Sequence, residues 1–185
     1  MPYETEKINA VLGLAVIAAL LCHAGTMTYS LITFWYDLAI CKFFAHLSVA
    51  LMVVHIFTSL CIFFFLHDGS SGSYLRMNKR TIVQRVTAIL MIILVHFHIT
   101  AYSHMATGET LTQAQAVTSC LTEVLYIISV LVHISVSFSK AFTTLGLISS
   151  SKAVKRLDCA AYITCAAGGL AALYAVISFF LGDIL

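Results

Sequence analysis

Histidine side chains recur inside apolar stretches of this 185-residue sequence, where ionisable groups are otherwise scarce. Burying an imidazole costs free energy unless its ring nitrogens have partners. Suitable partners are hydrogen-bonding groups and transition metals. Two of the eight histidines, His67 and His104, lie at the ends of such stretches, where an interfacial role is expected. The remaining six lie within them: His23, His46, His55, His96, His98 and His133.

Composition indicates the elements that position these histidines. The sequence is 61% hydrophobic and 10% charged, with a single proline. About 20 apolar residues span a bilayer core of roughly 30 Å as a helix. Five such stretches, at about 8–33, 42–66, 81–103, 118–148 and 158–182, predict an all-α integral membrane protein whose residues 1–185 form a single domain. No room is left for a soluble catalytic domain, and no nucleic-acid partner is expected.

The charges between the stretches predict the orientation in the membrane. Of the ten Lys and Arg residues, only Lys42 falls on the side that includes the predicted connection between the first two helices. The other nine lie on the opposite side, which the positive-inside rule assigns to the cytoplasm. We therefore expect a multi-pass protein of the cytoplasmic (inner) membrane with its N-terminus inside and its C-terminus outside. The basic segments "YLRMNKR" and "SSSKAVKR" are expected to be connections, which set the topology or also dock a soluble partner.

Depth in the membrane sorts four of the histidines into two pairs. With a rise of 1.5 Å per residue, His23 and His98 lie roughly 24–27 Å from the inner end of their helices. His55 and His133, on helices that run the other way, lie at roughly 14–22 Å. His96 and His98 are two residues apart, roughly 200° around a helix, so they cannot share one partner.

Two histidines that face each other across a helical bundle can supply the bis-imidazole ligation of a b-type haem, an arrangement suited to electron transfer. The alternative is that each ring is hydrogen-bonded to a neighbouring helix. Six cysteines without a CxxC or CxxCH pattern argue against a zinc site and covalently attached haem, although a Cys41–Cys120 disulfide is conceivable.

Polar residues toward the predicted cytoplasmic side fit the carboxylates of such a haem. Lys140 lies two turns beyond His133 on the same face. An unpaired lysine within the bilayer costs about 2.5–3.5 kcal/mol, which a haem propionate would offset. The alternative is that Lys140 extends to the inner interface. Gln84 and Arg85, at the inner start of the third helix, could contact propionates or lipid phosphate.

Four segments resemble the five-helix diheme cytochrome b membrane subunit of succinate dehydrogenases and fumarate reductases. "LGLAVIAALLCH" is similar to the first-helix pattern ending at a haem ligand, His23 here, and "FAHLSVALMVVH" resembles the second, ending at His55. "QRVTAILMIILVHFH" has the Gln-x-x-Thr and the ligand fourteen residues after the glutamine, which selects His98 over His96. "HISVSFSKAFTTLGL" resembles the fourth-helix pattern that begins at His133.

The resemblance implies four helices around two haems b. His55 and His133 would hold the haem nearer the cytoplasmic flavoprotein and iron–sulfur subunits, and His23 and His98 the other. Dicarboxylate chemistry would belong to the flavoprotein, and this subunit would pass electrons to or from menaquinone or ubiquinone. The glutamate that some fumarate reductases carry two residues before the fourth-helix ligand is Leu131 here, and no acidic residue matches their quinone-site glutamate. The quinone candidates near the outer haem are His46, Tyr102, His104 and Glu123.

Other interpretations share parts of this pattern. Glu123 could be an interfacial residue instead of a proton acceptor. The chain could be the diheme anchor of a different quinone-linked oxidoreductase, since ligand positions do not reveal the partner. The four-helix cytochromes b of hydrogenases and formate dehydrogenases distribute their ligands differently. A haem-free scaffold or small transporter would use the four histidines only as hydrogen-bonding residues.

Overall fold

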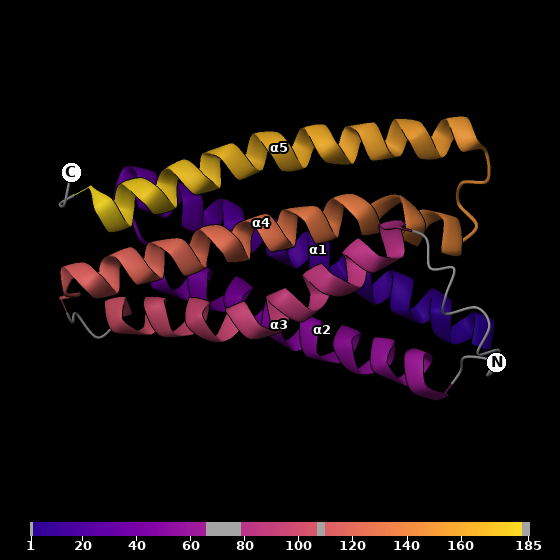
Figure 1. Cartoon of the computed structure of the whole chain (residues 1–185), viewed down its shortest axis with the longest axis horizontal. Coiled ribbons are helices and arrows are strands. Elements are labelled where there is room, and N and C mark those ends of the chain that lie inside the picture. Colours follow the sequence, from indigo (N-terminus) through magenta and orange to yellow (C-terminus); the bar gives the residue numbers. More distant parts are fainter. Residues whose placement is uncertain (1, 66–78, 107–109, 183–185) are drawn as a thin grey trace.

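Five long α-helices make up the described chain, residues 2–65, 79–106 and 110–182 of a computed structural model. Each is long and apolar enough to cross a membrane, so the five predicted spans are confirmed. They run side by side along the long axis, and the two termini lie at opposite ends (Figure 1). The helices are α1 (Pro2–Thr33), α2 (Leu38–Phe65), α3 (Lys79–Ala106), α4 (Gln113–Thr144) and α5 (Ser151–Leu181).

The helices begin earlier than the apolar stretches because polar caps, not hydropathy, determine where they start. The Asp37 carboxylate accepts from two backbone amides of the first turn of α2, and Thr112 forms a capping box with Gln115 at the start of α4. The expectation that "SSSKAVKR" is a connection is wrong, since Ser150 caps α5 and Ser151 begins it. Most of the other basic segment, including Arg76, lies outside the described residues.

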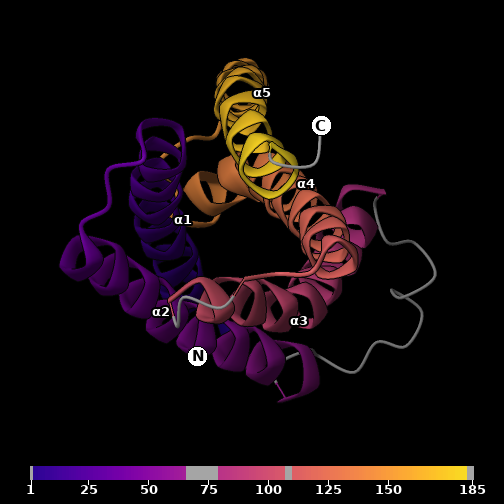
Figure 2. The same ribbon diagram turned by 90° about the vertical axis from the view of Figure 1, so that its left-hand side faces the viewer.

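Helix packing divides the bundle into two halves. Among the described residues, α1 packs against α2, α4 and α5, whereas α3 packs against α4 and makes no close backbone approach to α1 or α2. Viewed along the bundle, α1 and α2 lie on one side, α3 and α4 on the other, and α5 lies against α4 (Figure 2). We call the end with Lys7, Lys79 and Lys152 the basic end, and the end with Asp37 and Thr112 the far end.

Large apolar side chains are exposed on every helix, for example Ile8, Phe57, Ile89, Leu121 and Leu170. Such a surface is expected where lipid is the solvent. The packed interior is small: at the far end Ala101, Cys120, Val176 and Phe180 form a buried cluster between α3, α4 and α5. All six cysteines are free thiols, so the conceivable Cys41–Cys120 disulfide is not formed.

Arg80, in the first turn of α3, joins three helices near the basic end. Its guanidinium forms a two-pronged ion pair with Asp158 of α5, with N–O distances of 2.8 and 3.0 Å. It also donates to the Ser139 hydroxyl, at 2.9 Å, and to the Val136 carbonyl of α4, at 2.6 Å. Because charged hydrogen bonds in a low-dielectric setting are strong, this cluster fixes the position of α3 against α4 and α5.

Candidate functional site

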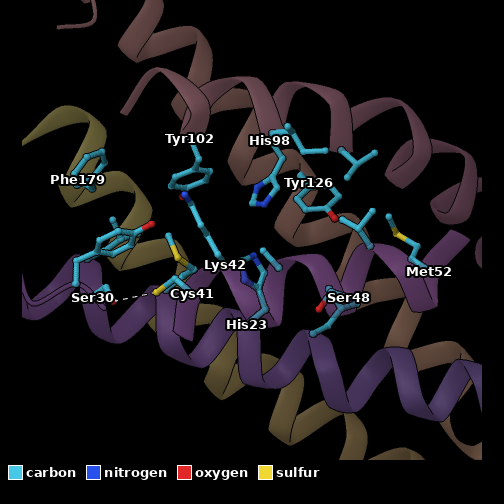
Figure 3. A pocket seen from close by; sticks show the side chains of 18 of the residues that line it. His23, Ser30, Cys41, Lys42, Ser48, Met52, His98, Tyr102, Tyr126 and Phe179 are labelled. Carbon is cyan, nitrogen blue, oxygen red and sulfur yellow. Dashed lines mark hydrogen bonds between the residues drawn. The ribbon is translucent and has the colours of Figure 1, made fainter. Parts of the chain in front are cut away.

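His23 of α1 and His98 of α3 point toward one another across the divide between the two halves (Figure 3). Their ring centroids are 6.0 Å apart and their planes are nearly perpendicular, at 87°. Two imidazoles that share a metal ion through bonds of about 2 Å, with each ring centre roughly 1 Å behind its nitrogen, have centroids about 6 Å apart. The observed spacing is therefore that of two rings that could share one ion.

A cavity of about 420 Å³ surrounds this pair and extends toward the far end. Its volume lies within the roughly 300–1,000 Å³ typical of small-molecule and cofactor sites. All five helices contribute to its largely apolar wall, which includes Leu20, Met52 and Val95. The polar groups of the wall are His23, Ser30, Tyr36, Lys42, Ser48, His98, Tyr102 and Tyr126.

The ring of His98 is held by α4. Its Nδ1 lies 2.9 Å from Oε2 of Glu123, which is only 1% exposed. A neutral imidazole that donates from Nδ1 to this carboxylate keeps the lone pair of Nε2 for another partner. Tyr102 and Tyr126 contact the same ring, with centroids 5.1 and 5.0 Å away. Interpreting Glu123 as an interfacial residue is therefore wrong: it is buried and bonded to a histidine from another helix.

The ring of His133 is held in an analogous way by α3. Its Nδ1 lies 3.1 Å from the Gln84 carbonyl and 3.1 Å from the Thr87 hydroxyl. The carbonyl can only accept, and the Thr87 hydroxyl hydrogen is directed to the Val83 and Gln84 carbonyls of its own helix. Nδ1 of His133 is therefore the donor, and its Nε2 also keeps a lone pair. A metal-binding histidine commonly donates its second ring nitrogen to such a partner.

His55 of α2 lies in a recess on α1. A Cβ atom added to Gly13 would stand 3.3 Å from Cε1 of His55, closer than ordinary van der Waals contact. Glycine at this position lets the imidazole approach the α1 backbone. His55 is also within electrostatic range of His133, so the second pair predicted by depth is near in space.

The two pairs lie at different depths in the bundle. His55 is level with Gly13, and His23 lies ten residues further along α1, a rise of about 15 Å. On α3, His98 lies eleven residues beyond Thr87, the contact of His133, a rise of about 17 Å. The inner pair, His55 and His133, is the nearer one to the basic end, and the outer pair is His23 and His98.

His23 and His55 differ from their partners at Nδ1. Among the described residues, Nδ1 of each is buried and unpaired. Leaving a buried nitrogen unpaired costs about 1–3 kcal/mol. The His55 ring is also within reach of the Asn9 backbone of α1, and the Nδ1 atom of each ring is left for a group bound between the halves.

Basic side chains gather beside the inner pair. Lys140 Nζ donates to Gln84 Oε1 at 3.4 Å, and Lys140 is within electrostatic range of Arg85 and Glu6. The Arg85 guanidinium lies 4.8 Å from the ring centre of Phe63 on α2. The three residues predicted from sequence to meet carboxylates of a bound group are thus near one another at the basic end.

The remaining candidates lie elsewhere. His96 and His46 are exposed, and neither is part of the cavity wall. Tyr102 does line the cavity. His104 belongs to the last turn of α3, and its side chain and the whole of His67 lie outside the described part of the structure. Leu131 contacts α5, because a Cβ at Gly169 would collide with its Cδ1 atom.

Sequence reasoning missed the residues that support the histidines. Thr87 was visible in the Gln-x-x-Thr pattern but not as a partner of His133, and Gly13 and Tyr126 gave no signal. Within the described residues, no group of three or more His, Cys, Asp or Glu side chains is placed so that it could hold a metal ion. Imidazoles in pairs are a donor set for an ion whose other ligands come from a cofactor.

Comparisons of the chain with protein-family models, with curated proteins and with solved structures found no match. Any assignment of function therefore rests on the site itself and on the resemblance of the four segments that carry its histidines.

Proposed function

We propose that this chain is the membrane-anchor cytochrome b subunit of a succinate dehydrogenase or fumarate reductase complex, with two bis-histidine haems b. The observation that carries the proposal is the arrangement of the four histidines. They form two pairs at two depths, and each pair has one ring held through Nδ1 so that its Nε2 is free. Haem b would supply a one-electron carrier with both axial positions filled, which suits electron transfer more than oxygen binding.

The residues fit such a group in three respects. The 6.0 Å spacing of His23 and His98 leaves room for one ion, and the surrounding cavity is largely apolar. Gly13 provides a recess for the ring of His55. Lys140 and Arg85 supply positive charge, and with Gln84 they would bind the propionates of the inner haem.

The expected orientation and the two depths together support one route for the electrons. The positive-inside rule favours the basic end as the cytoplasmic one, where flavoprotein and iron–sulfur subunits would dock. The inner pair lies nearer that end, and the outer pair opens into a cavity that continues toward the far end. A quinone, menaquinone or ubiquinone, would react near the far end.

Quinone reduction requires proton donors within hydrogen-bond reach, roughly 2.6–3.2 Å, or one bridging water. Of the four candidates, Tyr102 is the one that the cavity wall favours. His46 is exposed, and Oε2 of Glu123 is taken by His98. Tyr102→Phe, in protein that retains both haems, is expected to slow quinone reduction, whereas full activity would move the reaction away from this cavity.

The test of the proposal is the visible spectrum and haem content of the purified chain. We expect a b-type α-band in the reduced-minus-oxidised spectrum and two haems per polypeptide. Absence of extractable haem would refute the proposal and favour the haem-free scaffold or transporter. If the chain holds two haems but co-purifies with a partner that does not act on dicarboxylates, it is instead the anchor of a different quinone-linked oxidoreductase.

A further inference from the structure

Glu123 is a carboxylate about a third of the way along α4, a helix long and apolar enough to cross a membrane, with 1% of its surface exposed. Burying such a group is costly unless it is paired, and residues of this kind within membranes are generally functional. Its Oε2 is bonded to His98 Nδ1, while its Oε1 has no hydrogen-bond partner among the described residues. The carboxylate therefore contacts the imidazole of His98. Through this ring it can influence the group that binds to Nε2.

The two held rings differ in the charge of their partners. His133 donates to a backbone carbonyl and a hydroxyl, both neutral. His98 donates to a carboxylate, and hydrogen bonds to ionised acceptors are roughly twice as strong as neutral ones. A stronger acceptor at Nδ1 makes the imidazole a more basic ligand at Nε2. The inner and outer sites are therefore unequal in a way that the shared bis-histidine pattern does not reveal.

We propose that Glu123 is a positioning residue for His98. It holds His98 in the tautomer whose Nε2 is free, and it strengthens the electron donation of His98 to the outer haem iron. This inference rests on the proposed function, because it requires a haem on His98. Tyr102 and Tyr126 confine the ring through contacts with it, and Glu123 sets its rotation about the Cβ–Cγ bond. A more strongly donating ligand stabilises the oxidised over the reduced iron, so Glu123 lowers the midpoint potential of the outer haem.

Two substitutions separate charge from positioning. Glu123→Gln keeps an acceptor for Nδ1 but removes the charge, whereas Glu123→Leu removes both. Glu4→Gln is the matched control, because it deletes the same charge from an exposed residue near the basic end. His98→Ala identifies which of the two redox transitions belongs to the outer haem.

The experiment is a spectroelectrochemical redox titration of the purified complex with both haems bound. For Glu123→Gln we expect about a tenfold loss in the preference for oxidised iron, a rise of about 59 mV in the outer potential alone. Glu123→Leu should raise it at least as far and also change the low-spin ferric EPR signal, because the ring is then free to rotate. Glu4→Gln should change neither potential.

Two haems with unchanged potentials in Glu123→Gln would overturn the inference while leaving the proposed function intact. Haem-free wild-type protein would instead overturn the proposed function. If Glu123→Gln loses the outer haem, Glu123→Asp decides. Recovery of that haem with a potential near that of the wild type supports the role of the charge. Loss in both variants shows that the site tolerates neither the amide nor the shorter carboxylate, which makes Glu123 a residue needed to build the site and overturns the inference.

Discussion

Substitution of Gly13 tests whether the position of the His55 ring matters for a bound group. Gly13 contacts this ring but has no side chain that could bind a ligand. A methyl group at this position would lie 3.3 Å from Cε1 of His55, so the ring must retreat by a few tenths of an ångström. Metal–ligand distances tolerate about ±0.2 Å. We therefore expect Gly13→Ala to weaken binding of the inner haem about tenfold, or about 1.4 kcal/mol, with the outer haem unaffected.

Gly25→Ala is the matched control on the same helix, because nothing lies within 4 Å of an added Cβ there. Both substitutions raise intrinsic helix propensity by the same amount, about 1 kcal/mol relative to glycine. The assay is haem content per chain and the rate of haem transfer to an excess of an apoprotein acceptor. Equal content and equal rates in the two variants would refute the reasoning, since the contact with His55 would then have no consequence for a bound group.

Three further outcomes follow from the structure. His98→Ala should leave one haem per chain and His96→Ala both, by haem analysis; the reverse result would show that the wrong ring of α3 was assigned. Because Arg80 and Asp158 join α3 to α5, Asp158→Asn should lower the free energy of unfolding in detergent by about 2 kcal/mol, and a double-mutant cycle with Arg80→Met should show coupling. A reporter fused after Leu185 should be active only outside the cytoplasm; cytoplasmic activity would contradict the orientation drawn from the basic residues.

The helices could be predicted because hydropathy over about 20 residues is a strong signal that each span carries by itself. Their starts could not, because they depend on single polar residues. Ser150 ends the α4–α5 connection by accepting from the Ala153 amide, so basic residues counted as part of that connection belong to the first turns of α5. A charged, solvated helical turn and a charged loop have the same composition.

The histidines that were paired by depth also lie near each other in the structure. Depth could be predicted because the rise per residue converts a position in the sequence into a height along the helix, without any knowledge of packing. The direction of a side chain around its helix is less accessible. His46 is a quinone candidate in the sequence, but its side chain is exposed and is not part of the cavity wall. Glu123 was misjudged because its partner, His98, comes from another helix, and no pattern within α4 records that contact.

The division of the bundle into two halves has a consequence for the order of events during synthesis. After α1, α2 and α3 have entered the membrane, the packing among them is that of α1 with α2, because α3 approaches neither in the described chain. The halves join only when α4 and α5 arrive and pack against α1. Until then fewer helices enclose the space between His23 and His98, and under the proposed function a flat haem would reach it from the bilayer without parting packed helices. Under the proposed function, the packing of α4 and α5 against α1 would then close the bundle over the haem, so that haem loading would follow the order of synthesis.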